Sequence, residues 1–132
     1  MIRDLDHINI ATDRLAETRA FFVEVLGMTE RWRPEFPFDG CWLYVGDRPL
    51  VHLMARETAG VGCEAAALSH VAFAIDDIGA MAARLTELGV AFREIGAPGT
   101  PIRQLFLSDP NGVVIELNHL GYETARARSA AF

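Results

Sequence analysis

The segment Leu5-Asp6-His7-Ile8-Asn9-Ile10 decides the fold, because its pattern returns 63 residues later as Leu68-Ser69-His70-Val71-Ala72-Phe73. A second pair follows the same rule, since Val51-His52-Leu53 returns 64 residues later as Ile115-Glu116-Leu117. Three of the four histidines and one glutamate therefore occupy equivalent positions of an internal repeat. The sequence thus predicts two copies of one structural unit.

The composition is that of an ordinary globular protein. The chain has 132 residues, of which 51% are hydrophobic and 23% charged, enough for one domain with a sizeable core. A net charge of -6, without a cluster of Lys and Arg, argues against a nucleic-acid partner. The apolar stretches are no longer than a strand, so we expect no transmembrane helix and no membrane partner.

Two further features bear on the compartment. The first five residues lack the apolar core of a signal peptide. Cys41 and Cys63 do not have the spacing of a metal site, and both are expected to be free thiols. Free thiols are typical of a reducing compartment, so we expect a cytoplasmic protein.

Each copy is predicted to fold as a strand, a helix and three further strands, or βαβββ. Alternating and β-branched runs predict strands at 5–11, 29–33, 41–45 and 50–55, and again at 70–75, 91–95, 103–108 and 113–118. The helices are expected to begin after Asp13 and after Asp76 or Asp77 as N-caps, and to end at Gly27 and Gly89. The copies span 1–58 and 68–119, with a linker at 59–67 and an Ala/Arg-rich tail at 120–132.

Strand periodicity places the four repeated residues on equivalent faces. Because side chains alternate across a strand, Val51 faces the helix while His52 faces away from it. The same argument turns His7, His70 and Glu116 away from the helices. We therefore expect an α+β fold in which two βαβββ modules form an open, cupped, eight-stranded mixed sheet, or partial barrel. The helices would cover its convex face, and the four side chains would meet in its concavity.

Clustered imidazole and carboxylate groups indicate a metal site. The candidate ligands are His7, His52, His70 and Glu116, which suit a divalent ion of Fe, Mn, Ni, Co or Zn. Such a set leaves open positions on an octahedral ion, as catalysis requires. The alternative is that each histidine is separately a core or surface residue, which suits a lone histidine better than four equivalent positions.

The segment 31–42 is unusually aromatic. Its large rings could wall an apolar substrate pocket, or they could pack the core or a subunit contact: Trp32, Phe36, Phe38 and Trp42. By strand parity four polar or flexible side chains could line the same concavity: Asn9, Met54, Gln104 and Asn118. Arg103, on a predicted strand of the second copy, is a further candidate residue of the substrate pocket. His119 has the wrong parity for the site and is expected to be exposed, as are Arg126 and Arg128 in the tail.

From about residue 5 to 118, the chain resembles the vicinal oxygen chelate superfamily, which includes glyoxalase I, extradiol dioxygenases and the fosfomycin and bleomycin resistance proteins. The matching motifs are the two segments quoted first, Phe21-Phe22-Val23-Glu24-Val25-Leu26-Gly27, and Asp109-Pro110-Asn111-Gly112-Val113-Val114-Ile115-Glu116. The resemblance implies paired βαβββ modules around a divalent metal. It assigns His7, His70 and Glu116 to three metal positions, and places His52 where glyoxalase I typically has Glu or Gln.

Several reactions are compatible with this resemblance. The leading interpretation is proton abstraction beside a metal-bound carbonyl with Glu116 as base, giving an isomerase, an epimerase or a lactoylglutathione-lyase-type enzyme. The runner-up is an Fe(II) extradiol-type dioxygenase that uses His7, His70 and Glu116, although His52 would occupy a position that O2 and a diol need. A third is a non-catalytic antibiotic-binding or resistance protein. A fosfomycin-modifying enzyme is not favoured, because no Lys/Arg cluster is present for a phosphonate.

The expected partners are a small-molecule substrate and a second copy of the chain. Relatives of this size usually act as homodimers, and in several of them modules pair across the subunit boundary. His7 and His52 of one chain would then face His70 and Glu116 of the other. The sequence does not distinguish this arrangement from a site within one chain.

Overall fold

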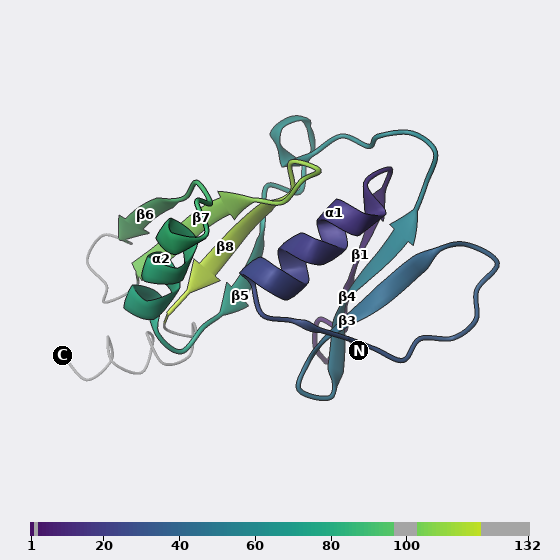
Figure 1. Cartoon of the computed structure of the whole chain (residues 1–132), viewed down its shortest axis with the longest axis horizontal. Helices are drawn as coiled ribbons and strands as arrows, with labels where there is room; N and C mark the ends of the chain where they lie inside the picture. Colours follow the sequence, from purple (N-terminus) through teal and green to yellow (C-terminus); the bar gives the residue numbers. More distant parts are fainter. Residues whose placement is uncertain (2, 97–102, 120–132) are drawn as a thin grey trace. The chain divides into compact units, whose positions relative to one another are not determined.

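The structure is a computed structural model of the chain, and it describes residues 1, 3–96 and 103–119. The expected tail at 120–132, with Arg126 and Arg128, lies outside the described residues. The chain divides into two compact units, Met1–Val61 and Gly62–Phe132, which are treated separately below. Each unit is a βαβββ module with a four-stranded mixed sheet, so the predicted α+β class and module topology are confirmed (Figure 1).

The first unit contains four strands and one helix. Their bounds are β1 Ile8–Thr12, α1 Leu15–Ala20, which continues as the π-helical turn η1 Phe21–Val25, β2 Thr29–Arg31, β3 Gly40–Val45 and β4 Arg48–Ala55. The sheet order is β1-β4-β3-β2, with β1 parallel to β4 and the other pairs antiparallel. Helix α1 packs against β4. The core between the helical segment and the sheet consists of buried apolar residues: Ile10, Phe22, Leu43, Val51 and Leu53.

The start of α1 differs from the prediction of an Asp13 cap. Arg14 holds the N-cap position and makes no side-chain cap. The neighbouring hydroxyl groups take over: the Arg14 amide donates to Thr12 Oγ1 at 2.9 Å, and Thr18 Oγ1 donates to the Arg14 carbonyl at 2.7 Å. Both threonines are buried, so they fix the chain where it leaves β1. The helical segment ends at Gly27, as predicted, with a φ of 76° that suits glycine.

The second unit repeats this order. Its elements are the 3-10 turn η2 Cys63–Ala65, β5 Val71–Ala74, α2 Ile78–Glu87, β6 Arg93–Gly96, β7 Arg103–Ser108 and β8 Val114–Asn118. The sheet order is β5-β8-β7-β6, with β5 parallel to β8. Asp77 caps α2 by accepting a hydrogen bond from the Ala80 amide at 2.9 Å, and Gly89 follows the helix with a φ of 67°. Helix α2 packs against β7, and the core beneath it is apolar: Leu85, Leu105, Leu107, Ile115 and Leu117.

Part of the expected linker packs onto the turn before β8. The Cys63 amide donates to the Gly112 carbonyl at 3.0 Å, and the Val114 amide donates to Cys63 Sγ at 3.4 Å. A Cβ on Gly62 would lie 2.7 Å from the Gly112 oxygen and 2.8 Å from the Asn111 oxygen. Glycine at position 62 thus permits a close backbone approach.

No helix in the described ranges is long and apolar enough to cross a membrane. Cys41 and Cys63 are both free thiols. Burial, above all, raises the pKa of the Cys41 thiol to about 11.

The substitution Gly62→Ala is expected to lower the free energy of unfolding by about 1–3 kcal/mol, because two backbone oxygens would have to move. Gly60→Ala is the matched control. Its Cβ would meet Arg56 Nη1 at 3.5 Å and the Ala11 carbonyl oxygen at 4.0 Å, both ordinary contacts. Urea denaturation of both variants measures the difference, and equal midpoints would contradict the close packing at Gly62.

Candidate metal centre

In the first unit, His7 and His52 lie face to face. His7 directly precedes β1, while His52 stands in β4 opposite Asn9, so the parallel pairing of these strands brings the two rings together. Their centroids are 3.8 Å apart and their planes differ by 14°. The apolar neighbours of His52 in β4, Val51 and Leu53, are buried on the other face. The predicted parity of this strand is therefore confirmed.

His52 offers an unused nitrogen. Its Nε2 is shut off from solvent and has no hydrogen-bond partner among the described residues. Burial, and next the neighbouring His7, lower the pKa of His52 below its ordinary value. Both causes favour the neutral form of the imidazole, which is the form that binds metals. A buried acceptor left unpaired costs about 1–3 kcal/mol, so a divalent cation at Nε2 would relieve this cost.

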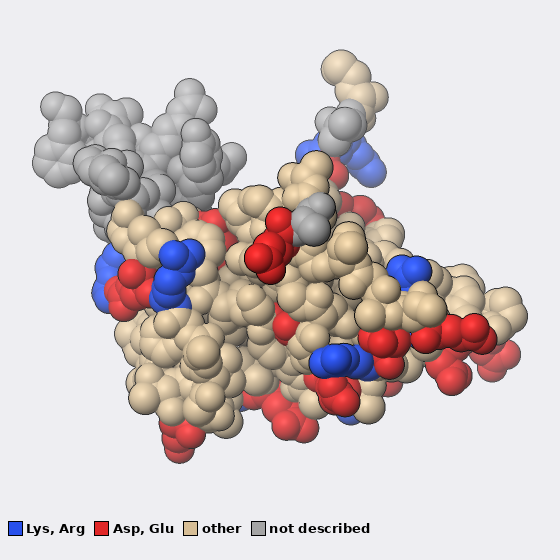
Figure 2. Space-filling view, turned by 90° about the horizontal axis from the view of Figure 1, so that it is seen from above, with Lys and Arg blue, Asp and Glu red and all other residues tan. Residues whose placement is uncertain are grey.

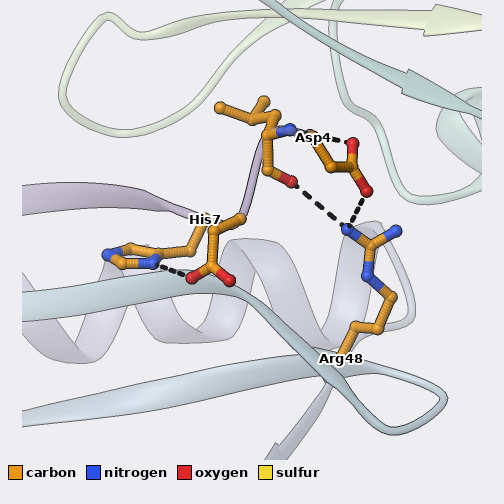
Figure 3. Close-up of polar contacts among 5 residues, drawn as sticks. Asp4, His7 and Arg48 are labelled. Carbon is orange, nitrogen blue, oxygen red and sulfur yellow. Dashed lines mark hydrogen bonds and ion pairs between the residues drawn. The ribbon is translucent and has the colours of Figure 1, made fainter. Parts of the chain in front are cut away.

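His7 is oriented by the residue before it. Asp6 Oδ2 lies 2.6 Å from His7 Nδ1, and this hydrogen bond, with His7 as donor, is the main cause that lowers the pKa of Asp6 (Figure 3). Because Nδ1 donates to the carboxylate, Nε2 is the ring nitrogen whose lone pair could bind a metal ion. A carboxylate behind a histidine in this way is the usual support of a metal-binding imidazole.

The segment before His7 is tied to the start of β4. Arg48 Nη2 donates to Asp4 Oδ2 and to the Leu5 carbonyl, both at 3.2 Å (Figure 3). The Leu5 amide in turn donates to Asp4 Oδ1 at 2.8 Å. These exposed contacts are individually weak, but together they direct the segment that carries His7 toward the strand that carries His52.

In the second unit, His70 and Glu116 form the corresponding pair. His70 precedes β5, Glu116 stands in β8 opposite Ala72, and His70 Nε2 lies 3.0 Å from Glu116 Oε2. Ser69 Oγ lies 2.7 Å from His70 Nδ1, as Asp6 does from His7 Nδ1 in the first unit. The residue before each histidine thus contacts Nδ1 in both copies.

Glu116 is buried, with 5% of its surface exposed, and its second oxygen is held by amides. Gln104 Nε2 donates to Glu116 Oε1 at 2.5 Å, and Asn118 Nδ2 contacts the same oxygen at 3.3 Å. A buried carboxylate is stable only when its oxygens have partners. These amides do not contact Oε2, which lies beside His70, so Oε2 is the oxygen that could bind a metal ion.

Each unit therefore presents two side chains that could bind a metal ion. The described part of the chain contains no group of three or more His, Cys, Asp or Glu side chains that could hold a metal ion. Metal sites normally use three or four protein ligands. Each pair, taken within its own unit, has the composition of half a site.

The aromatic residues of the segment 31–42 gather beside His52. Trp42 stands opposite His52 across β3 and β4, and their rings stack at 3.9 Å with an angle of 9°. Trp32 packs edge-on against Trp42 at 6.1 Å, and Phe36 lies 6.3 Å from it. Phe38 stacks on Phe36 at 5.1 Å.

These aromatic side chains do not form a core. Trp32 is 72% exposed, Phe36 40% and Phe38 39%. The Arg33 guanidinium lies over both phenylalanine rings and donates to the Phe38 carbonyl at 2.6 Å, which holds the loop together. The core interpretation of these three residues is therefore wrong, whereas a substrate wall or a subunit contact stays open.

The remaining predicted site residues are placed as follows. Asn9 is exposed opposite His52, and Met54 is half-buried opposite Gly40. Arg103 shares the strand parity of buried Leu105, not of Gln104, and pairs with Glu94 instead of joining Glu116.

His119, predicted to be exposed, is half-buried, and its Nδ1 has no partner among the described residues. Its amide donates to the Arg103 carbonyl at 3.4 Å, which continues the β7–β8 ladder by one residue and keeps His119 next to β7. Sequence reasoning also missed Asp6 and Ser69. A polar residue before both repeated histidines was the available signal.

Comparison with known proteins matches residues 4–117 to the Glyoxalase/Bleomycin resistance protein/Dioxygenase superfamily. A glyoxalase family protein from Bacillus anthracis is similar in structure, with 27% identity, a TM-score of 0.75, and coverage of 89% of this chain and 95% of that one. The fosfomycin resistance protein FosX from Listeria monocytogenes has 20% identity, a TM-score of 0.74, and coverage of 95% and 99%.

A lactoylglutathione lyase from Agrobacterium tumefaciens has 17% identity, a TM-score of 0.67, and coverage of 87% and 92%. At these lower identities the likeness to FosX and to the lyase concerns the fold alone. Among curated protein sequences, none matches this chain significantly.

Trp42 is expected to report on metal binding at His52. The chain has two tryptophans, so a Trp32→Phe variant emits from Trp42 alone. Because the Trp42 ring stacks on His52, Co(II) or Ni(II) bound at Nε2 should quench its fluorescence. Titration of this variant with and without His52→Ala provides the measurement. Equal quenching in both proteins would contradict a role of His52 as a ligand.

Proposed function

The chain belongs to the Glyoxalase/Bleomycin resistance protein/Dioxygenase superfamily, and on this premise we propose that it is a divalent-metal-dependent enzyme. Its substrate would be a small oxygenated molecule that chelates the ion. The observation that carries the proposal is that each unit brings two potential metal-binding side chains together at equivalent positions of the repeat. The pairs are His7 with His52 and His70 with Glu116.

The proposed ligand set joins both pairs on one ion. It consists of Nε2 of His7, Nε2 of His52, Nε2 of His70 and Oε2 of Glu116. The contacts of these residues support this set, because Asp6 and Ser69 engage the Nδ1 atoms while Gln104 engages Glu116 Oε1. Fe, Mn, Ni, Co and Zn all accept imidazole and carboxylate ligands. In a mutant of the Listeria FosX, the same fold was crystallised with Mn(II) and a dihydroxypropylphosphonic acid.

We propose proton abstraction beside a carbonyl as the chemistry, with an isomerase, an epimerase or a lactoylglutathione-lyase-type outcome. The ion would polarise the substrate carbonyl and stabilise negative charge on its oxygen. Glu116 would accept the proton at Oε2, because Oε1 is already held by the amide of Gln104. His70 Nε2 lies 3.0 Å from that oxygen, so the two proposed ligand atoms of this unit are adjacent.

The alternatives are less well supported. An extradiol-type dioxygenase would use His7, His70 and Glu116, but Nε2 of His52, which has no hydrogen-bond partner in the described part of the chain, would offer a fourth metal ligand in addition to this triad. For a fosfomycin-type phosphonate, the basic residues of the described chain offer little: Arg103 pairs with Glu94 and Arg33 is held by its own loop. On the face that Figure 2 shows, the blue basic side chains lie among red acidic ones.

The exposed aromatic cluster supports contact with an apolar part of the substrate. Trp42 links this cluster to His52, so a substrate that chelates the ion would lie near the rings of Trp32 and Phe36. A non-catalytic antibiotic-binding protein could use the same cluster, and it would not need the four ligands. Cytoplasmic location and a homodimeric state are further parts of the proposal.

Loss of any one ligand is expected to weaken metal binding by more than about 100-fold, beyond the usual cost of removing a supporting residue. Single variants of His7, His52, His70 and Glu116 to Ala, titrated with Co(II), give the measurement. Metal analysis of wild-type protein purified anaerobically accompanies it. Absence of a tight divalent site in the wild type would overturn both enzyme interpretations.

Proton abstraction is expected to appear as exchange of carbon-bound hydrogen beside the carbonyl. A panel of α-hydroxy and α-oxo carbonyl compounds in D2O, followed by NMR, should show exchange with the metal-loaded wild type and none with Glu116→Gln. Consumption of O2 with a catechol by the Fe(II)-loaded protein, without such exchange, would favour the dioxygenase instead.

A mixed dimer is expected to distinguish a shared site from one within a single chain. If ligands are shared, pairing a His7→Ala chain with a Glu116→Ala chain leaves one of two sites intact, and half of the metal binding returns. If each chain completes its own site, both sites stay defective. Stoichiometry of bound Co(II) in the purified mixed dimer measures the outcome.

A further inference from the structure

The two units surround their strand-borne ligands differently. Directly across the sheet, Trp42 faces His52 and Phe106 faces Glu116. At the next position on the same face, the pair is Gly40 with Met54 in the first unit and Gln104 with Asn118 in the second. These positions correspond at an offset of 64, so the repeat itself makes the comparison.

Only the carboxylate receives amide donors at these positions. Gln104 and Asn118 both contact Glu116 Oε1, at 2.5 and 3.3 Å. In the first unit, a Cβ on Gly40 would clash with the Leu53 carbonyl oxygen, so a glutamine there has no room. The amides thus accompany the ligand that needs them, because an imidazole has one free donor atom whereas a carboxylate has two oxygens that can compete for an ion.

Glu116 is held in one orientation by these contacts. Its carboxylate is buried, Oε1 receives the Gln104 amide, and Oε2 lies 3.0 Å from His70 Nε2. Rotation that brought both oxygens to one ion would break the 2.5 Å hydrogen bond and leave a buried oxygen without its main donor. Both amides are neutral, so they orient the carboxylate without cancelling its charge.

We propose that Gln104 is a positioning residue that makes Glu116 a one-oxygen metal ligand through Oε2. The inference rests on the proposed function, because it requires that Glu116 binds a divalent ion. Gln104 itself does not touch the ion and acts through Glu116. Asn118 supports the same oxygen from the neighbouring position in β8.

The test is a double-substitution cycle with Co(II) as the probe. Gln104→Met keeps the length of the side chain but removes the donor, and it is expected to weaken Co(II) binding by about 10- to 100-fold. The visible spectrum of bound Co(II) is expected to shift, because a released carboxylate can bind through both oxygens. In a Glu116→Gln background, Gln104→Met should leave the remaining affinity unchanged, since the residue through which it acts is already altered.

Arg103→Met is the matched control, because Arg103 is adjacent in β7, lies on the other face and pairs with Glu94. It should leave Co(II) affinity and spectrum at wild-type values. Should Gln104→Met fail to fold, as judged by circular dichroism, Gln104→Asn serves in its place, because its shorter amide cannot reach Oε1.

The outcomes separate the two proposals. A wild type without Co(II) binding overturns the proposed function. A wild type that binds Co(II), combined with an effect of Gln104→Met that is absent or equally large in the Glu116→Gln background, overturns the positioning role alone.

Discussion

The parallel pairing of the first strand with the last strand of each βαβββ unit is the constraint on which the candidate site depends. In the first unit this pairing sets Asn9 opposite His52, and in the second it sets Ala72 opposite Glu116. A histidine two residues before Asn9 or Ala72 then lies beside His52 or Glu116 of the last strand. A shift of one residue in either register would turn His52 or Glu116 into the apolar core, so burial of the neighbouring residues fixes these two side-chain pairs.

The same constraint explains how two equal backbones support unequal chemistry. His52 and Glu116 each have one residue directly opposite on the neighbouring strand and two more on the same face, and these three positions can change without altering the register. Around His52 they are Trp42, Gly40 and Met54, so a neutral imidazole is packed by a ring and kept from water. Around Glu116 they include two amides, so a buried charge keeps hydrogen-bond partners.

Much of this arrangement follows from the sequence, for a physical reason. Strand alternation is set by covalent geometry, so Val51 and Ile115 in the core predict the direction of the next side chain. The helix ends at Gly27 and Gly89 could also be predicted from the sequence, because few residues other than glycine adopt a positive φ.

Contacts between side chains are a different matter, because they depend on rotamers and on distant neighbours. Asp13 has the better capping propensity, yet Arg14 holds the N-cap position and its amide donates to the buried Thr12 hydroxyl. Arg103 could be placed on a strand but not paired with Glu94, and the stacking of Trp42 on His52 required the register of β3. Periodicity therefore predicts which residues approach one another, and packing decides which atoms remain free.

The number of protein atoms that could bind the metal ion, more than the fold, bears on the class of reaction. An octahedral ion has six positions, and three protein ligands would leave room for both a chelating diol and O2. Four protein ligands leave two positions, enough for the two oxygens of a chelating substrate and no more. His52 would be the fourth in the proposed set, and its buried Nε2, without a partner among the described residues, is suited to that role. Because glyoxalase-type chemistry needs a chelated substrate and a nearby base but no O2, a metal-bound imidazole at position 52 would favour the proposed proton transfer over oxygenation.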